Sequence, residues 1–193
     1  MIHYPAGSAP KVIKQSAKKL PRSFSSANRG MNLEEDINIS NQYYIDKEIA
    51  VITKRPTPIN VVKVDYSKGA KITDAYFEKQ STTDYNGAYR GKYIDFEAKS
   101  TKLRTSFPLS NITIHQIKHL QRVLKHGGIA FFIIRFETRD ETYLLDASFV
   151  ILAFGGEKRK SIPYEDIKNN GHLIKKGFIP RLFYLEVVDA LYF

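Results

Sequence analysis

The apolar run at residues 129–136 constrains the fold of this 193-residue chain more than any other feature. A strand with one face in water alternates apolar and polar residues, whereas residues 129–134 are apolar without a break. The run is therefore typical of a strand that is covered on both faces. It is also far shorter than the ~20 residues that span a bilayer, so we expect no membrane partner.

The flanking sequence supplies elements that can cover such a strand. One helix is predicted to begin near Gly30, with a stripe at Leu33, Ile37, Ser40 and Tyr44. Short strands are predicted at residues 49–52 and 142–145, and residues 147–154 contribute to a core or an interface. Strands that alternate with helices indicate an α/β fold, with a mixed sheet flanked by helices.

A second helix is predicted over residues 114–125 and ends at Gly127-Gly128. Its spacing predicts four inward-facing side chains, Ile114, Ile117, Leu120 and Leu124.

The charge of the chain is strongly basic, with 30 Lys+Arg against 20 Asp+Glu and a formal net charge of +10. Nine of these ten net charges fall in residues 1–30 and 51–80, which leaves the rest of the chain nearly neutral. An excess of this size indicates a polyanionic partner such as nucleic acid. The chain has no Cys, which excludes disulfides, thiolate metal sites and cysteine nucleophiles.

Both basic segments differ from an ordinary core sequence. Residues 1–30 contain no acid and are rich in Ser, Ala, Pro and Gly, so we expect a flexible basic arm ahead of a single domain at residues 31–193. The arm lacks the apolar core of a signal peptide, which makes a cytoplasmic location the expectation. Residues 56–78 are predicted to insert a projecting hairpin with arms at residues 60–66 and 71–77.

The alternation at residues 93–99 places charges on one face of a strand. Glu97 and Lys99 share that face with Asp95, while the other face is apolar. Asp84 precedes a predicted turn at Asn86-Gly87, so a hairpin over residues 81–99 lets Asp84 meet Glu97. Two adjacent carboxylates make a hard-oxygen site that suits Mg²⁺, and a lysine beside it can neutralise charge on a phosphate.

Less specific interpretations of the same residues exist. A strand face with alternating charge is more often a solvated face or an ion pair. His115 and His119 have the spacing of zinc ligands, but a phosphate or core contact is favoured for them. Asp95 is either an outer carboxylate of the site or a charge at a strand end.

Longer blocks of sequence are more specific than the catalytic spacing. Residues 81–87, 91–99, 105–109 and 115–117, together with Asn28-Arg29-Gly30-Met31 and Lys54-Arg55-Pro56-Thr57-Pro58, resemble the RecU family of Holliday junction resolvases. The resemblance covers residues 28–193. It implies a restriction-endonuclease-like fold and a homodimer that nicks two strands of a four-way DNA junction symmetrically. The implied cofactor is Mg²⁺, with Mn²⁺ as a substitute, and family members are thought to modulate the RecA recombinase.

The resemblance also assigns roles. It implies Asp84 and Glu97 as catalytic metal carboxylates, Lys99 as the transition-state lysine, and Thr82 and Gln116 as further metal contacts. Glu34 or Glu35 is implied as a carboxylate from the first helix.

The hairpin corresponds to a stalk that enters the junction. The implied DNA contacts are Lys54, Arg55, Lys63, Tyr66, Lys68, Lys71, Tyr76 and Phe77. The alternative, that the aromatic residues pack the hairpin against the body, is at least as good for Phe77. Two other functions remain open: a duplex-cutting nuclease of the same superfamily, and a non-catalytic protein that binds or anneals DNA.

Overall fold

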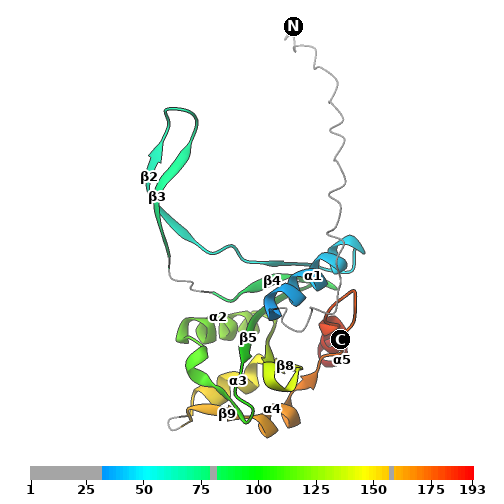
Figure 1. The fold of residues 1–193 in the computed structure, drawn as a ribbon. Helices are drawn as coiled ribbons and strands as arrows, with labels where there is room; N and C mark the ends of the chain where they lie inside the picture. Colours follow the sequence, from blue (N-terminus) through cyan, green and yellow to red (C-terminus); the bar gives the residue numbers. More distant parts are fainter. Residues whose placement is uncertain (1–31, 79–81, 157–158) are drawn as a thin grey trace. The chain divides into compact units, whose positions relative to one another are not determined.

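The computed structural model describes residues 32–78, 82–156 and 159–193 (Figure 1). The arm predicted at residues 1–30 lies outside these ranges. The elements in chain order are α1 (Leu33–Asp46), β1 (Val51–Lys54), β2 (Ile59–Asp65), β3 (Lys71–Phe77), β4 (Tyr85–Tyr89), β5 (Lys92–Thr101), β6 (Ser106–Pro108), the 3-10 turn η1 (Leu109–Asn111), α2 (Ile114–Lys125), β7 (Ile129–Phe136), the 3-10 turn η2 (Glu137–Arg139), β8 (Glu141–Asp146), α3 (Ala147–Phe154), β9 (Ser161–Pro163), α4 (Tyr164–Asn170), β10 (His172–Leu173) and α5 (Tyr184–Tyr192).

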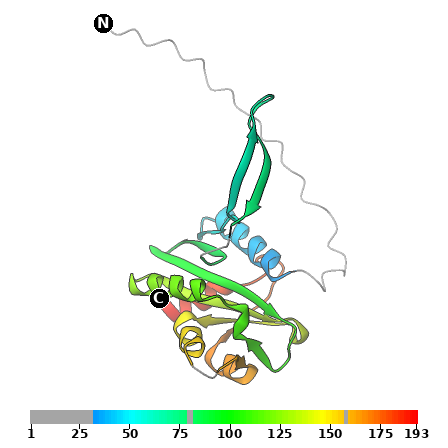
Figure 2. The same ribbon diagram turned by 90° about the vertical axis from the view of Figure 1, so that its left-hand side faces the viewer.

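A six-stranded mixed sheet organises the body, with the strand order β1-β4-β5-β7-β8-β10. The central pair β5 and β7 is parallel and α2 connects its strands, whereas the other neighbouring pairs in the sheet are antiparallel. Figure 2 shows helices on both sides of this sheet. The predicted α/β fold with a mixed sheet flanked by helices is confirmed.

The strand β7 lies between two hydrophobic cores and contributes side chains to both. Phe131 and Ile133 pack into a core with α1 and α5, while Phe132 and Ile134 pack into a second core with α2, α3 and α4. All eight residues of β7 are buried. The prediction that both of its faces are covered is therefore confirmed, because successive side chains of a strand enter opposite cores.

The prediction of a turn at Asn86-Gly87 is wrong. Both residues lie within β4, and the turn to β5 falls at Arg90 and Gly91, whose φ angles of 48° and 74° are left-handed. Gly87 serves another purpose, because a Cβ there would lie 1.9 Å from the carbonyl oxygen of Val51 on β1. The glycine allows close packing of two strands, a requirement that looks like a turn signal in sequence.

The stripe predicted for α2 is partly wrong. The helix has the predicted bounds, but Ile114 is 47% exposed, while Gln116 and Val123 are buried beside Ile117 and Leu120. A polar residue thus occupies the buried stripe, which a count of apolar residues cannot show. The first helix begins at Leu33, where the side chain of Asn32 caps it.

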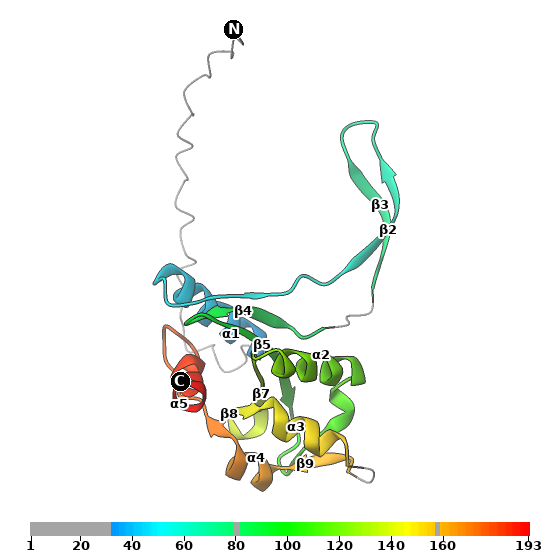
Figure 3. The same ribbon diagram turned by 180° about the vertical axis from the view of Figure 1, so that it is seen from behind.

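The hairpin of β2 and β3 forms a two-stranded sheet of its own (Figure 3). β3 is exposed throughout, and β2 has two half-buried residues. The predicted hairpin is thus present between β1 and β4.

Residues 147–154 form the helix α3, which buries Ala147, Val150 and Ala153. Within the described ranges, no helix is both long and apolar enough to cross a membrane.

Candidate active site

The pairing of β4 with β5 brings Asp84 next to Glu97. Tyr85 is opposite Phe96 in the register, so the preceding residue Asp84 falls beside Glu97. The backbone N–H of Asp84 donates to Oε2 of Glu97 over 3.2 Å, and the N–H of Ala98 donates to Oδ2 of Asp84 over 3.3 Å. The two carboxylates that the sequence singled out are therefore neighbours.

A stack of aromatic rings supports this pair from the opposite face of the sheet. Tyr85, Phe96 and Phe131 lie on adjacent strands with ring centroids 4.9 Å and 4.7 Å apart and nearly parallel planes. All three side chains are fully buried. Offset aromatic pairs contribute ~0.5–1.5 kcal/mol beyond the area they bury, so the strands that carry the carboxylates rest on a rigid layer.

Lys99 and Gln116 converge on the same oxygen of Glu97. The Nζ of Lys99 lies 2.6 Å from Oε1, and the Nε2 of Gln116 donates to that oxygen over 2.5 Å. The other end of the Gln116 side chain accepts the backbone N–H of Thr113 over 2.9 Å in a capping box at the start of α2. The helix cap thus fixes the amide that orients Glu97.

Burial sets the acidity of Glu97. The side chain is 0% exposed, and this desolvation, together with the negative charge of Asp84, raises its pKa to about 8, although Lys99 acts in the opposite direction. A divalent cation would stabilise the ionised form of a buried carboxylate that lies beside another carboxylate.

The donor set is small. No group of three or more His, Asp or Glu residues that could hold a metal occurs within the described part of the chain. Two neighbouring carboxylates fit Mg²⁺, which is usually bound by one or two carboxylates together with waters and substrate phosphate.

The other two predicted metal contacts are less direct. Gln116 presents its amide nitrogen to Glu97, while its oxygen is engaged by the cap. Thr82 is half-buried two residues before Asp84. Their roles toward a metal stay predictions.

A second buried carboxylate, Asp95, forms the centre of a polar cluster on the same face of β5. It accepts hydrogen bonds from Arg55 (2.6 Å) and Tyr93 (2.8 Å), contacts Nε2 of His119 at 2.8 Å, and also accepts one from Thr83. Burial alone would raise the pKa of Asp95, but these hydrogen bonds and the charge of Arg55 hold it below its usual value. Asp95 is thus an ionised, fully partnered residue of the interior.

Arg55 links this cluster to Asp84. Its backbone N–H donates to the carbonyl oxygen of Asp84 over 2.8 Å, and its guanidinium donates to Thr83 and Asn86 over 3.1 Å each. Arg55 therefore fastens the residues on both sides of Asp84, a role that sequence reasoning missed. Asp95 could have indicated this role, because a charged side chain on a strand that a helix covers needs a partner of opposite charge.

The two acids implied from the first helix lie in different surroundings. Glu34 is half-buried, pairs with Lys54, and accepts the Tyr85 hydroxyl at its carbonyl oxygen over 3.3 Å, which places it beside the strand that follows Asp84. Glu35 is exposed. Which of the two acids joins the site stays a prediction.

The predicted DNA contacts fall into two groups. Lys54 and Arg55, at the root of the hairpin, are paired with carboxylates. The hairpin residues are exposed, namely Lys63, Lys68, Lys71, Tyr66 (75%), Tyr76 (60%) and Phe77 (79%). The alternative that Phe77 packs the hairpin against the body is therefore wrong.

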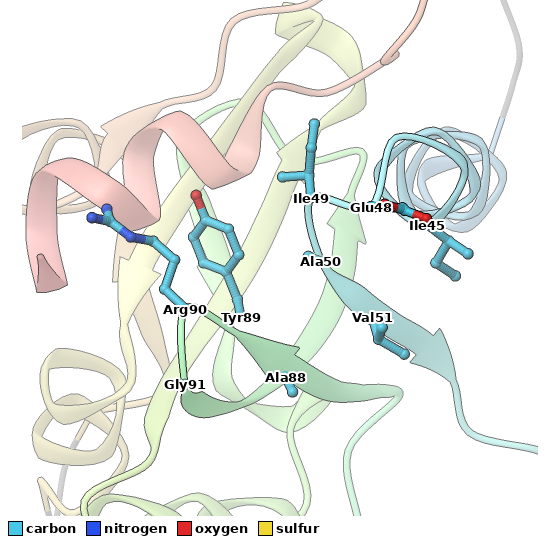
Figure 4. Close-up of a pocket in the computed structure, with 9 residues that line it drawn as sticks. All are labelled: Ile45, Glu48, Ile49, Ala50, Val51, Ala88, Tyr89, Arg90 and Gly91. Atoms are coloured by element: carbon cyan, nitrogen blue, oxygen red, sulfur yellow. The ribbon is translucent and has the colours of Figure 1, made fainter.

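A hollow of about 300 Å³ lies elsewhere, between the end of α1, β1 and the β4–β5 turn (Figure 4). Tyr89 and Arg90 border it, and both contact Asp189 of α5 over 2.9 Å. It lies at the Tyr89 end of β4, whereas Asp84 precedes the Tyr85 end. This hollow is therefore separate from the carboxylate pair.

The pattern of sequence over the whole body has a match among known families. The family model described as "RecU: Recombination protein U" matches residues 28–190. The chain belongs to the RecU family.

Named relatives extend this match over the whole length of the chain. "Holliday junction resolvase RecU" of Geobacillus kaustophilus (strain HTA426) is 52% identical, over 100% of this chain and 98% of that protein. The protein of the same name from Bacillus cereus (strain G9842) is 48% identical over the same shares. The solved structure of Hjc from Archaeoglobus fulgidus, a Holliday junction resolvase, covers 75% of this chain and 95% of its own at 12% identity and a TM-score of 0.45, a likeness too remote to bear on function.

The RecU match includes the residues discussed above. It spans Asp84, Glu97, Lys99 and Gln116 as well as the hairpin of β2 and β3. The resemblance to the RecU family seen in the sequence blocks is thus confirmed, whereas the roles of individual residues stay predictions.

Proposed function

We propose that this protein is a Mg²⁺-dependent endonuclease that resolves four-way DNA junctions by paired symmetric nicks. The observation that carries the proposal is the neighbouring carboxylates Asp84 and Glu97, of which Glu97 is fully buried, with Lys99 2.6 Å from Glu97, in a RecU-family chain. Relatives about half identical over their length are named Holliday junction resolvases. Residues 31–193 would form the nuclease domain, with the hairpin as an insertion.

Asp84 and Glu97 would hold the metal. Bound there, Mg²⁺ would lower the pKa of an attacking water and stabilise negative charge on the phosphate. Glu97 must give up its proton to bind, because its pKa is raised to about 8. Gln116 keeps Oε1 of Glu97 in place through the fixed cap of α2.

Lys99 supplies the positive charge of the site. Its side chain is 25% exposed while Glu97 is 0% exposed, so the ammonium lies between the buried carboxylate and solvent, where a DNA phosphate would arrive. A donor at that position can stabilise the charge that builds on the phosphate in the transition state.

The hairpin would recognise the branch point. Its exposed aromatic rings, Tyr66, Tyr76 and Phe77, are suited to stack on bases that a crossover leaves open, and its lysines to contact phosphates. A continuous duplex offers no such open bases. The predicted basic arm, outside the described residues, would add salt-sensitive affinity.

Two symmetric cuts require two active sites related by a two-fold axis, so a homodimer is part of the proposal. An effect on the RecA recombinase stays a prediction.

The test is incubation of the protein with a synthetic four-way junction and with a linear duplex of matched sequence, each with and without Mg²⁺. We expect nicks at symmetric positions in the junction with Mg²⁺ and little cleavage of the duplex. Mn²⁺ should substitute.

A variant that lacks residues 64–72 separates the rival functions. It should lose junction cleavage, whereas a duplex-cutting nuclease would be little affected by the deletion. Wild-type protein that binds both DNAs and cuts neither would instead indicate a non-catalytic DNA-binding protein.

A further inference from the structure

The segment Arg55-Pro56-Thr57-Pro58 joins the sheet of the body to the hairpin, and the proposed chemistry leaves its two prolines unexplained. β1 ends at Lys54 and β2 begins at Ile59, so these four residues are the whole connection where the chain enters the hairpin. Figure 3 shows it as an extended stretch between the two strands. Pro56 is exposed and Pro58 is half-buried, so burial in a core does not account for the prolines. We call residues 55–58 the proline linker.

Every residue of the proline linker has a restricted backbone. Pro56 and Pro58 each have a fixed φ of about −65°. Arg55 and Thr57 each precede a proline, which excludes the helical region and favours an extended conformation. A single proline is enough to end a strand, whereas the alternation makes the whole connection stiff.

Both ends of the proline linker are held by hydrogen bonds. At one end, the backbone N–H of Arg55 donates to the carbonyl oxygen of Asp84 over 2.8 Å, and its guanidinium lies 2.6 Å from the buried Asp95. At the other end, the carbonyl oxygen of Pro58 accepts the N–H of Glu78 over 2.9 Å. Glu78 directly follows β3, so this bond extends the ladder of the hairpin. The linker thus runs from a metal carboxylate of the candidate active site to the base of the hairpin.

The length of the linker is comparable to the spacing of nucleotides. Three residue steps of about 3.1 Å in an extended proline-rich chain span about 9 Å. Phosphates of one DNA strand succeed each other by about 3.4 Å of axial rise, so this length equals about two to three nucleotides. A flexible connection of the same length would let the hairpin shift by that much relative to Asp84, whereas a stiff one would not.

We propose that the proline linker determines cleavage position, because it fixes how many nucleotides separate the cut phosphodiester from the branch point of the junction. The inference rests on the proposed function, in which the hairpin enters the branch point and Asp84 belongs to the cutting site. Pro56 and Pro58 are positioning residues, since they act through the hairpin and Asp84.

The test compares the wild type with a double variant, Pro56→Gly and Pro58→Gly, which frees all four residues of the linker. The matched control is Thr57→Ala, which changes an exposed residue of the same linker and keeps both prolines. Thermal unfolding checks that the variants are folded. If the double variant does not fold, Pro56→Ala and Pro58→Ala are measured singly.

The first measurement maps nicks on strand-labelled junctions with a fixed branch point, incubated in Mg²⁺. Several junctions with different arm sequences separate distance from sequence preference. We expect the wild type and Thr57→Ala to nick at one or two neighbouring positions, and the double variant to nick over about three or more, since its hairpin can shift by several ångströms.

Three results would overturn the proposal. The first is a double variant that nicks at the wild-type positions. The second is an equal spread of nicks in Thr57→Ala. The third is a folded double variant that binds the junction and does not nick it, because the prolines would then be needed for the chemistry and not for its position.

The second measurement needs neither metal nor DNA. The chain has no Cys, so Lys68→Cys in the hairpin and Lys168→Cys on α4 provide two unique sites for spin labels. Labelled protein is diluted with excess unlabelled protein, and pulsed electron paramagnetic resonance gives the distribution of distances within one chain. The width of the distribution should at least double when the two prolines are replaced by glycine and stay unchanged in Thr57→Ala. Equal widths in all proteins would overturn the proposal.

The two measurements separate this inference from the proposed function. If the wild type fails to cut junctions, the proposed function fails, while the distances still show whether the linker is stiff. If the wild type cuts and the double variant cuts at the same positions, only the present inference fails.

Discussion

The sheet of the body and the β2–β3 hairpin break the rule of apolar inside and polar outside in opposite directions. In the body, Asp95 and Glu97 are 0% exposed, while in the hairpin Tyr66 and Phe77 are 75% and 79% exposed. A buried charge costs several kcal/mol unless it is partnered, and an exposed aromatic ring forgoes its burial energy. The comparison teaches that folding energy alone explains neither region, which is why we assign cutting to the first and junction recognition to the second.

The largest expected effect comes from Glu97→Gln, which keeps the shape of the buried side chain and removes its charge. We expect junction cleavage in Mg²⁺ to fall by ~10³-fold or more, because a metal ligand and its charge are lost. Junction binding without metal should be retained. A gel assay that follows binding and nicking in the same samples measures both, and near-normal nicking would show that the buried charge is not used for cutting.

A smaller effect is expected at the root of the hairpin, where adjacent cations have different partners. Arg55→Gln leaves the buried Asp95 without its guanidinium and should lower the free energy of unfolding by about 3 kcal/mol or more. Lys54→Gln breaks a pair whose members are each 41% exposed and should cost less than ~1 kcal/mol. Urea unfolding of both variants checks the difference. If both variants lost the same free energy of unfolding, the ion pair between Arg55 and Asp95 would not stabilise the fold more than the exposed pair does.

The exposed rings of the hairpin should affect binding and leave stability alone. Tyr66→Ala and Phe77→Ala are each expected to weaken junction binding by roughly tenfold, since base stacking contributes ~1–3 kcal/mol per base. Their melting temperatures should match the wild type, while the buried Phe96→Ala should lower the free energy of unfolding by ~3–5 kcal/mol. Destabilised hairpin variants would instead favour a packing role for these rings.

The last prediction is a gradual one: the affinity for Mg²⁺ should depend on pH. Because the pKa of Glu97 is raised to about 8, Mg²⁺ must displace a proton below that pH, and its affinity should rise about tenfold per pH unit between pH 6 and 8. The stability of the fold should depend on pH in the opposite direction. Without metal, the protein should become less stable as the pH rises from 4.5, the ordinary pKa of a glutamate, to about 8, the pKa of Glu97 in the folded protein. Calorimetric titration with Mg²⁺ at several pH values measures the first effect, and Glu97→Gln should abolish the second.

Much of this arrangement could be predicted from local pattern. The apolar run at residues 129–134 of β7, the alternation of β5 and the bounds of α2 follow from side-chain periodicity, which is a local property. The approach of Asp84 to Glu97 was expected from a hairpin over residues 81–99, but its register was not: the predicted turn at Asn86-Gly87 would not pair the two residues, whereas the observed turn at Arg90-Gly91 does.

What the sequence could not predict depends on contacts between distant segments. Gly87 is needed because β1 packs against it, and Gln116 is buried because it reaches Glu97. The link from Arg55 to Asp95 joins residues 40 positions apart. No periodicity records such a pairing.

The central claim is that the carboxylate pair of the sheet cuts DNA, and Asp84→Ala tests it most directly. Wild-type and variant protein are incubated with a strand-labelled four-way junction in Mg²⁺, with binding measured in parallel. The account predicts that the variant binds the junction and leaves all four strands intact, while the wild type nicks two of them symmetrically. Symmetric nicks by Asp84→Ala would contradict the assignment of the site.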